Sequence, residues 1–298
     1  MANLRDVRLR MRAIRQTLQV TKAMNLISTA KLRKGRRVLE DTEPFFNRIQ
    51  NSMYDILCGA GNVKSDYFGR ALKTATPRSA IIVVSSDRGL AGGYNANIFR
   101  TVNKLCEALV NPVLILIGAV GYRYFLHSPH VILENFSFKS RLPEVVDAKE
   151  IADYIVSQYD SGVFDEVYIV YTYMYSTIKL VPEAQMILPL NLEKMQAQER
   201  GTHLDYEERP SRIQFDYVPS VEEVFDALVP FYMKGIVYGA LVEGYVSEQS
   251  ARMAAMDEAS KSAEKMLSSL QIFYNRVRQA GITQEVTEIV SGSAALSD

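Results

Sequence analysis

The sequence predicts an α/β protein in which a doubly wound α/β domain is combined with a long antiparallel coiled coil of the N- and C-terminal helices. Three observations carry this prediction. An apolar stripe with heptad-like spacing runs through the first 57 residues, and the same spacing returns in the last third of the chain. Between them, unbroken apolar runs alternate with helical patterns, which is typical of a parallel sheet. The expected divisions are residues 1–60, 77–195, a linker at 196–219, and 220–298.

The N-terminal stripe steps by three and four residues from Leu4 to Ile56 and predicts a helix over residues 3–57, roughly 80 Å long. Pro44 is expected to kink this helix, and Gly59 and Gly61 are expected to end it. The stripe is polar in its middle, over Thr21–Ser28. Polar seam residues usually fix the register of a coiled coil. Alternatively, this segment faces something other than its partner helix.

The C-terminal stripe predicts a second helix, uninterrupted by proline from residue 231 to 291 and roughly 90 Å long. Ser220 followed by Glu223 reads as a capping box, and Pro230 is expected to break or kink the first turns. The expected seam continues through Val242, Tyr245, Gln249, Arg252, Met256, Ala259, Ala263, Met266, Leu270, Phe273, Val277 and Ala280.

The central region is read as alternating strands and helices. Ala80–Ser85 and Val113–Ile117 are continuous apolar runs, as in strands that are buried on both faces. Later strands are expected at Glu166–Tyr175 and Leu180–Leu190, with helices at Tyr94–Val110, Gly121–His127 and Val145–Tyr159. Residues 196–219 are polar and contain two prolines, which indicates a linker.

Charge and cysteine content restrict the class of protein. The first 40 residues carry eleven of the 34 lysines and arginines but only two of the 34 acidic residues, so a basic arm precedes an acidic body. Such an arm favours an anionic partner. Cys58 and Cys106 give neither a disulfide framework nor metal-ligand spacing. No signal peptide or apolar run of membrane-spanning length is present, so any membrane association is expected to be peripheral.

Three motifs could carry chemistry, and each has a plainer explanation. The segment Ser85–Asn95 (SSDRGLAGGYN) lies where a phosphate loop would, but it lacks the P-loop lysine and reads as a tight turn with Asp87 and Arg88 as a local pair. His127 and His130 flank a loop without a third metal ligand. The basic run Lys31–Arg37 lacks the aromatic residues that stack on bases. No catalytic triad or carboxylate pair stands out, so no cofactor, metal or catalytic residue is expected.

Several blocks resemble the gamma subunit of the rotary F-type ATP synthase, in the order and spacing of that family. They are VTKAMNLISTAKLRK (Val20–Lys34), SSDRGLAGGYN, SEQSARMAAMDEAS (Ser247–Ser260) and RQAGITQEVTEIVSGSAALSD (Arg278–Asp298). The resemblance implies a non-catalytic central-stalk rotor of the bacterial type. Its coiled coil would stand inside a hexamer of alpha and beta subunits, and its foot would bind the epsilon subunit and the membrane c-ring. The complex would lie peripherally at the cytoplasmic face of the cell membrane.

The resemblance also assigns residues. Contacts to the alpha and beta subunits are implied for Met24, Arg252, Arg278, Gln279, Thr283, Glu285, Thr287 and Glu288, and a foot contact is implied for Tyr217. The cysteine-bearing insert of the chloroplast subunit (CF(1)) is missing, which argues against thiol regulation. Two rival functions remain: a nucleotide-binding enzyme using Ser85–Asn95, and a coiled-coil scaffold on nucleic acid. Nucleotide affinity of the isolated chain, or strongly salt-dependent binding, would distinguish them.

Overall fold

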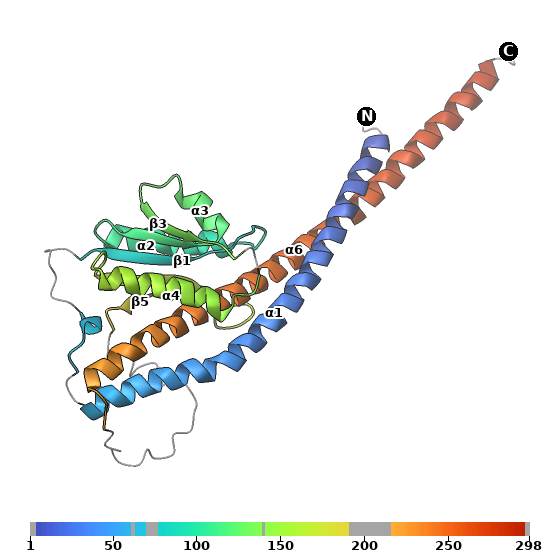
Figure 1. Ribbon diagram of the computed structural model, residues 1–298. Coiled ribbons are helices and arrows are strands. Elements are labelled where there is room, and N and C mark those ends of the chain that lie inside the picture. The colour runs from blue at the N-terminus through green and yellow to red at the C-terminus, as the bar shows by residue number, and fades with distance from the viewer. Residues whose placement is uncertain (1–3, 61–62, 70–76, 139–140, 191–215, 296–298) are drawn as a thin grey trace. The chain divides into compact units, whose positions relative to one another are not determined.

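The computed structural model describes residues 4–60, 63–69, 77–138, 141–190 and 216–295. The chain divides into two compact units, which are described separately: residues 1–29 with 252–298, and residues 30–251. Two long helices run through both units (Figure 1), α1 over Leu4–Ala60 and α6 over Val221–Ala295. Most of the expected linker, residues 196–215, lies outside the described residues.

Both helices continue through their prolines. Pro44 lies inside α1 and Pro230 inside α6, so of the two outcomes expected at Pro230, a break or a kink, the break does not occur. A proline removes one helical hydrogen bond, but fully buried side chains on both sides of it, Val229 and Met233, hold the helix in place by packing. The helix begins at its predicted cap, where the Glu223 N–H donates to Ser220 Oγ at 3.2 Å.

The unit of residues 30–251 contains a five-stranded sheet with the strand order β3-β2-β1-β4-β5. The chain passes through η1 (Asp66–Phe68), β1 (Ser79–Val84), α2 (Tyr94–Ala108), β2 (Val113–Ile117), α3 (Ala119–Phe125), β3 (Val131–Phe136), α4 (Val145–Asp160), β4 (Glu166–Met174) and β5 (Leu180–Leu188). The first four strands of this order pair in parallel, and β5 pairs antiparallel with β4. The predicted α/β class is confirmed, whereas β3 was not predicted.

Helices cover both faces of the sheet (Figure 1). The helix α4 lies on the opposite side from α2 and α3. One core joins α2 and α3 to the strands, with Ile81, Leu114, Ile98, Val102 and Phe125 completely buried or nearly so. All six residues of β1 are buried, which explains why this strand is a continuous apolar run rather than an alternating one.

Within the same unit, α1 and α6 pack closely through glycines. A Cβ added to Gly35 of α1 would lie 2.7 Å from Val246 Cγ2 of α6, and a Cβ added to Gly235 of α6 would overlap the ring of Phe46 of α1. The α6 helix is buried on nearly every side between residues 237 and 250, as expected for a helix that is apolar around its whole circumference.

By length and composition, α6 could also cross a membrane. The span Val221–Ser291 contains an 18-residue window with a mean hydropathy of 1.3, and 50% of that window is buried inside the protein. A packed core helix has the same composition, so this observation is weak evidence for a membrane span.

Candidate functional site

The unit of residues 1–29 and 252–298 is an antiparallel helix pair that carries most of the predicted contact residues. Arg8 donates to the Tyr274 hydroxyl at 2.7 Å, and Lys22 forms an ion pair with Glu264 at 2.6 Å. On α1, the predicted stripe positions Val7 and Met11 are buried, whereas most of their neighbours are exposed. The pairing direction and the α1 seam therefore follow the apolar pattern of the sequence.

The polar middle of the α1 seam faces α6. Thr21 and Ser28 are buried, with 7% and 1% of their surface exposed. The Ser260 hydroxyl donates to Thr21 Oγ1 at 2.8 Å, and the Asn25 amide donates to the Met253 carbonyl at 3.0 Å. These hydrogen bonds join polar groups inside the seam, and such pairs fix the register of two helices.

The outer side of the same α1 segment exposes large apolar side chains. Leu26 is 71% exposed, and Val20 and Ile27 are each 57% exposed. Met24 is half-buried. The segment therefore has two different faces. Its hydroxyl and amide groups bond to α6, and its aliphatic side chains are exposed on the other side, where another protein surface could cover them.

Beyond Ala263, the seam of α6 agrees with the prediction at Leu270 and Val277, which are half-buried, but is displaced by one residue at Met266 and Phe273. Met266 and Phe273 were expected in the seam but are 56% and 41% exposed. Leu267 and Tyr274 are half-buried in their place. Both sets of positions fit a spacing of three and four, and the sequence offers apolar side chains on two adjacent faces, so spacing alone could not choose between them.

Beyond Val277, the α6 helix has no cover from the described part of the chain. From Arg278 to Val290, every residue except Gly281 is exposed. The helical backbone continues to Ala295, so 18 residues extend past the paired segment. The side chains of residues 292–295, and residues 296–298 altogether, lie outside the described residues.

Six of the predicted contact residues lie on this exposed stretch. The Thr283 and Thr287 hydroxyls donate to carbonyls one turn earlier, at 3.0 and 2.8 Å, and Gln284 donates to Glu288 Oε1 at 3.0 Å. The remaining predicted groups on the stretch are Arg278, Gln279 and Glu285, all of them exposed. The stretch thus presents carboxylate, guanidinium and amide groups to its surroundings.

An apolar stripe on the same stretch was not predicted. Ile282, Val286, Ile289 and Val290 are between 53% and 71% exposed and follow helical spacing. Contiguous exposed apolar surface usually marks a protein interface. The spacing i, i+4, i+7 is visible in the sequence, but the predicted seam was traced only as far as Ala280.

The other two predicted contact residues lie elsewhere. Arg252, at the start of the paired α6 segment, is only 7% exposed, so its side chain is largely covered within the chain itself. Tyr217 is half-buried, just before α6 begins. Their proposed contacts to other subunits stay predictions.

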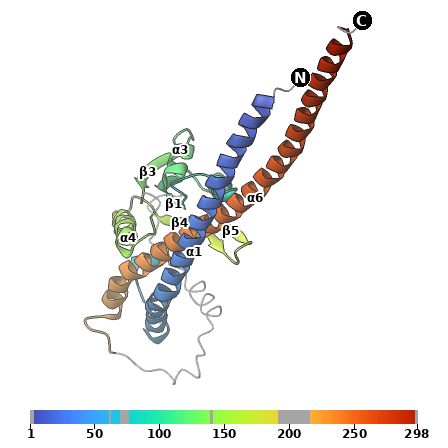
Figure 2. The ribbon, with the colours of Figure 1, turned by 90° about the vertical axis from the view of Figure 1, so that its right-hand side faces the viewer.

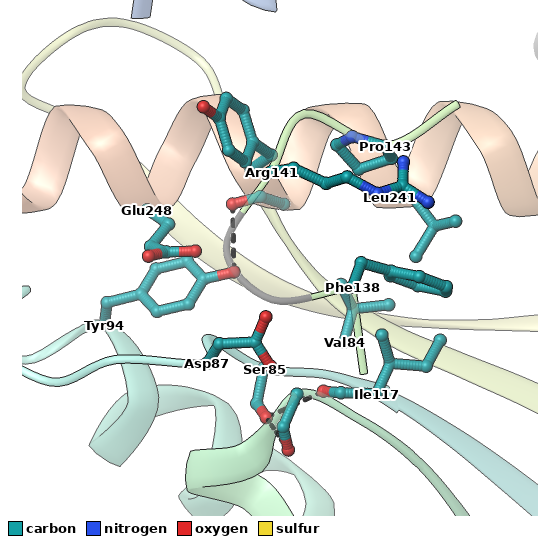
Figure 3. A pocket seen from close by; sticks show the side chains of 13 residues that line it. Val84, Ser85, Asp87, Tyr94, Ile117, Phe138, Arg141, Pro143, Leu241 and Glu248 are labelled. Carbon is teal, nitrogen blue, oxygen red and sulfur yellow. Dashed lines mark hydrogen bonds between the residues drawn. The ribbon is translucent and has the colours of Figure 1, made fainter. Parts of the chain in front are cut away.

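The segment Ser85–Asn95 forms a compact turn. The Asn95 amide and the Ser86 hydroxyl are joined at 2.7 Å, and Asp87 Oδ1 accepts from the Ala119 N–H and the Ser137 hydroxyl, both at 3.0 Å. The cavity beside it is lined by Tyr94 and Glu248 among others (Figure 3) and has a volume of about 40 Å³. Ligand pockets usually enclose about 300–1,000 Å³, so this cavity is far too small for a nucleotide.

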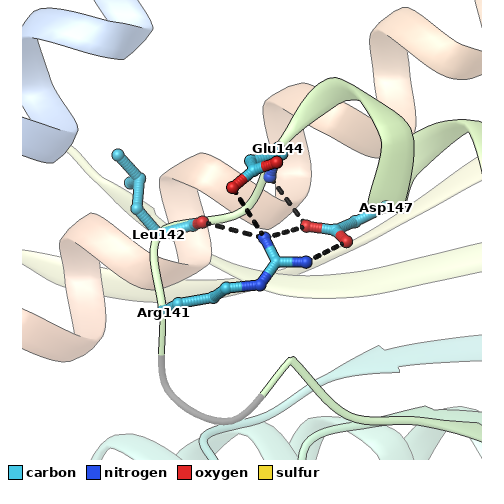
Figure 4. A network of polar contacts seen from close by, with 4 residues as sticks. All are labelled: Arg141, Leu142, Glu144 and Asp147. Atoms are coloured by element: carbon cyan, nitrogen blue, oxygen red, sulfur yellow. Dashed lines mark hydrogen bonds and ion pairs between the residues drawn. The ribbon is translucent and has the colours of Figure 1, made fainter.

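A charged network joins Arg141 and Glu144 to Asp147 at the start of α4 (Figure 4). Arg141 contacts the two carboxylate oxygens of Asp147 at 2.8 and 2.5 Å, and Asp147 also accepts the Glu144 N–H at 2.7 Å. This arrangement caps α4 and leaves the Arg141 guanidinium engaged with carboxylates. The network is therefore structural rather than an anion site.

The two neighbouring histidines have no third metal ligand beside them among the described residues. His127 and His130 line a shallow groove with Cys106 and Tyr124. Within the described residues, no group of three or more His, Cys, Asp or Glu side chains could hold a metal ion.

Cys106 should be unreactive in the folded chain. Burial, reinforced by the Glu107 carboxylate, raises the pKa of its thiol to about 11, and only 6% of the residue is exposed. Thiolate therefore forms only as the pH approaches that value, and thiolate is the reactive species. Iodoacetamide at pH 8 should leave the Cys106 peptide unmodified in the native protein and alkylate it fully in denaturant, as read by mass spectrometry. Rapid native labelling would contradict this.

Three side chains of α6, one turn apart, hold the hairpin formed by β4 and β5. Glu243 Oε1 accepts the Met174 N–H at 2.7 Å, the Ser247 hydroxyl donates to the Thr172 carbonyl at 2.9 Å, and the Ser250 hydroxyl donates to the Thr177 carbonyl at 3.1 Å. All three are buried, and each bonds to the backbone of the hairpin. These contacts fix how the sheet sits on α6 (Figure 2).

Replacing Glu243 by alanine should destabilise the chain by about 1.5–3 kcal/mol, because a buried N–H loses a charged acceptor. Glu243→Gln should lose less stability, since an amide oxygen can still accept the hydrogen bond from the Met174 N–H. Denaturant unfolding, together with hydrogen exchange at the Met174 amide, measures both effects. Glu258→Ala, at an exposed site on the same helix, is the matched control and should change stability by less than about 0.5 kcal/mol. Equal stability of Glu243→Ala and Glu258→Ala would contradict this role.

These features define a class of protein in which an antiparallel pair of long terminal helices is joined to an α/β sheet and the C-terminal helix extends beyond its partner. Residues 3–296 match the family model described as ATP synthase. The chain is 40% identical to the ATP synthase gamma chain of Acetivibrio thermocellus, over 99% of this chain and 100% of that one. It is 34% identical to the gamma chain of Acetobacterium woodii named as sodium ion specific, over 99% of each. The chain belongs to the gamma subunit family of the F-type ATP synthases.

Solved structures agree at the level of the fold. A chain of the Euglena gracilis mitochondrial ATP synthase superposes with a TM-score of 0.65 at 14% identity, covering 98% of this chain and 94% of that one. A chain from the central stalk and c-ring of the Tetrahymena thermophila enzyme superposes with a TM-score of 0.59 at 23% identity, covering 81% and 99%.

Proposed function

We propose that this chain is the central-stalk rotor of an F-type ATP synthase and has no catalytic site of its own. It couples rotation of a membrane c-ring, driven by ion flow, to conformational change and ATP synthesis or hydrolysis in the beta subunits. Its partners are the hexameric ring of alpha and beta subunits, the epsilon subunit and the c-ring. The complex is peripheral at the cytoplasmic face of the cell membrane, and the chain binds no nucleic acid.

The observation that carries this proposal is the unpaired, solvent-exposed C-terminal end of α6. An isolated helix of this length is marginal in water, and its apolar stripe of Ile282, Val286 and Ile289 is exposed in the chain alone. A collar of other subunits around residues 278–295 would cover the stripe and hold the helix. The polar groups of the same stretch, Arg278 to Glu288, could then form charged hydrogen bonds, each contributing about 1.5–3 kcal/mol.

The basic arm supports the same arrangement. Eleven lysines and arginines lie within the first 40 residues, and Leu26 and Ile27 lie exposed among them. Acidic loops on a surrounding ring would attract this arm. The small cavity at the Ser85 turn offers no support for a nucleotide-binding enzyme. The foot contact proposed for Tyr217 places epsilon and the c-ring near the start of α6.

Purification of the tagged chain from its source tests the proposal. It should co-purify with subunits that carry ATPase activity, and the isolated folded chain should neither hydrolyse ATP nor bind nucleotide tightly. Turnover by the pure chain that is abolished by substitution of Asp87 or Arg88 would overturn the non-catalytic assignment. Recovery of the chain with nucleic acid, and without ATPase subunits, would overturn the rotor assignment.

Met24→Lys should uncouple the assembled complex. Met24 lies half-buried between the polar seam and the exposed face of Leu26 and Ile27. A lysine there adds a charge that can bond to acidic partner loops, a contact that the native rotor lacks. ATP-driven ion pumping in vesicles should fall while ATP hydrolysis persists. Met24→Leu conserves volume and charge and should behave as the native chain does. Unchanged pumping by the Met24→Lys complex would count against the contact.

A further inference from the structure

The turn between β4 and β5 exposes large side chains at its tip. Ile178 is 94% exposed, Tyr175 is 56% exposed, and Tyr173 at the end of β4 is 39% exposed. Turns usually use glycine, proline, asparagine, aspartate or serine, for conformational reasons. An isoleucine that leaves nearly its whole side chain in solvent contributes little to the stability of the chain by burial. Its presence at this tip therefore calls for a different explanation.

The tip is ordered by its own hydrogen bonds. Ser176 Oγ accepts the N–H groups of Ile178 and Lys179 at 3.3 and 3.0 Å, and the Ser176 N–H donates to the Lys179 carbonyl at 3.3 Å. The Tyr175 hydroxyl donates to Glu183 Oε1 at 2.6 Å. These bonds fix the backbone of the turn at Ile178 and leave its side chain in solvent.

Both long helices contact the tip or the residue just before it. The fully buried Ser250 of α6 donates to the Thr177 carbonyl at 3.1 Å, and Arg36 of α1 contacts Met174 Sδ at 3.7 Å. A loop that is fixed before binding loses little conformational entropy when a partner binds. An aliphatic side chain on such a loop has the character of an interface anchor.

The exposed charge of the tip itself is Lys179, whereas the Glu243 carboxylate that accepts the Met174 N–H is buried. Lys179 Nζ lies 4.9 Å from the centroid of the Tyr175 ring, and a second cation, Arg36 of α1, contacts Met174 Sδ. The nearby Glu183 carboxylate is already bonded to the Tyr175 hydroxyl. A partner surface that carries carboxylates around an apolar pocket would complement this arrangement.

We propose that the tip at residues 175–179 is a docking surface for an acidic protein partner, with Ile178 inserted in an apolar pocket of that partner and Lys179 paired with carboxylates at its rim. A lipid surface fits less well, because membrane binding at an interface needs a larger apolar area and several basic side chains. The proposal rests on the proposed function in that the partner is another subunit of the same complex.

Site-specific crosslinking in the purified complex tests the position of the tip. The photoreactive amino acid p-benzoylphenylalanine is introduced at position 178 and, as a control, at position 146. Val146 of α4 is 70% exposed in the same unit but lies outside the tip. The probe at 178 should crosslink to one subunit, at a peptide that contains Asp or Glu beside apolar residues, and the probe at 146 should not reach that peptide. Crosslinks to lipid, to a second copy of this chain or to no partner would overturn the proposal.

Competitive assembly tests how much the tip contributes to binding of the chain in the complex. Each variant is co-expressed with the native chain, and the ratio of the two in the purified complex is read by mass spectrometry. Ile178→Asp should be incorporated roughly tenfold less than the native chain, as for loss of an interface anchor. Lys179→Glu should be depleted by a smaller factor, and Ile178→Leu and Val146→Asp should match the native chain.

The high exposure of Ile178 keeps this comparison interpretable, because Ile178→Asp should leave the Tm of the isolated chain unchanged. Equal incorporation of Ile178→Asp and Val146→Asp would overturn the proposal while leaving the rotor function intact. Failure of the native chain to enter any ATPase complex would instead overturn the proposed function itself, so the two failures are distinguishable.

Discussion

Replacing Gly35 by leucine should lower the free energy of unfolding by about 1–3 kcal/mol and reduce assembly of the complex. A Cβ at this position would lie 2.7 Å from Val246 Cγ2 and 3.4 Å from Tyr245 Cδ1. Val246 is completely buried and β-branched, so it strongly prefers a single rotamer and has little room to move. The backbones of α1 and α6 would have to separate, and the buried contacts on either side of Gly35 would open with them.

The matched control is Gly239→Ala on α6. No atom lies within 4 Å of a Cβ added to Gly239, although it too is a glycine in a helix interior. Alanine there should stabilise the chain by about 0.5–1 kcal/mol, because glycine loses more backbone entropy in a helix. Denaturant unfolding of both variants should therefore give changes of opposite sign. If Gly35→Leu were as stable as the native chain, the close packing of the two helices would be the wrong explanation for this glycine.

The sequence pattern was sufficient for the helices and for most of the sheet. Steps of three and four residues located Val7, Met11, Thr21 and Ser28 on the buried side of α1, because a helix repeats every 3.6 residues. Continuous apolar runs located β1 and β2, since a strand that is covered on both faces needs no polar alternation. These features depend only on local periodicity.

The parts that could not be predicted depend on contacts between distant residues. The strand β3 contains Glu134 and Asn135 and lies at the edge of the sheet, so neither alternation nor a continuous run marks it. The α6 helix continues through Pro230 because of tertiary packing, which sequence rules based on neighbouring residues do not take into account. The choice of Leu267 over Met266 for the seam likewise depends on the surface that α1 presents.

The candidate contact surface was predicted in its polar part and missed in its apolar part. Thr283, Glu285 and Glu288 were singled out through the family resemblance, and all three are exposed on the unpaired end of α6. Ile282 and Val286 are their neighbours in the sequence and were not singled out, although they are 53% and 55% exposed. The exposed tip of the β4–β5 hairpin was also missed, because exposure of Ile178 follows from the three-dimensional packing around it and not from its neighbours in sequence.

The largest functional effects are expected at the end of α6. Two changes there should distinguish the residues that keep the helix in place from the residues that transmit torque. Deleting Gly292–Asp298 removes the small-residue tip beyond the apolar stripe. This tip should act as a bearing, so its loss should reduce assembly or thermal stability more than ATP turnover per assembled complex.

Replacing Arg278, Gln279, Glu285 and Glu288 together by alanine removes groups that can form charged hydrogen bonds, at about 1.5–3 kcal/mol each. This variant should assemble, because Ile282, Val286 and Ile289 remain to be covered by the collar, but its torque in single-molecule rotation should fall severalfold. The conservative set Glu285→Gln with Glu288→Gln retains hydrogen-bonding capacity and should lose less torque than the alanine variant. If deletion of Gly292–Asp298 left assembly intact but stopped rotation, the bearing assignment would be wrong, and the tip itself would have to be the element that transmits force.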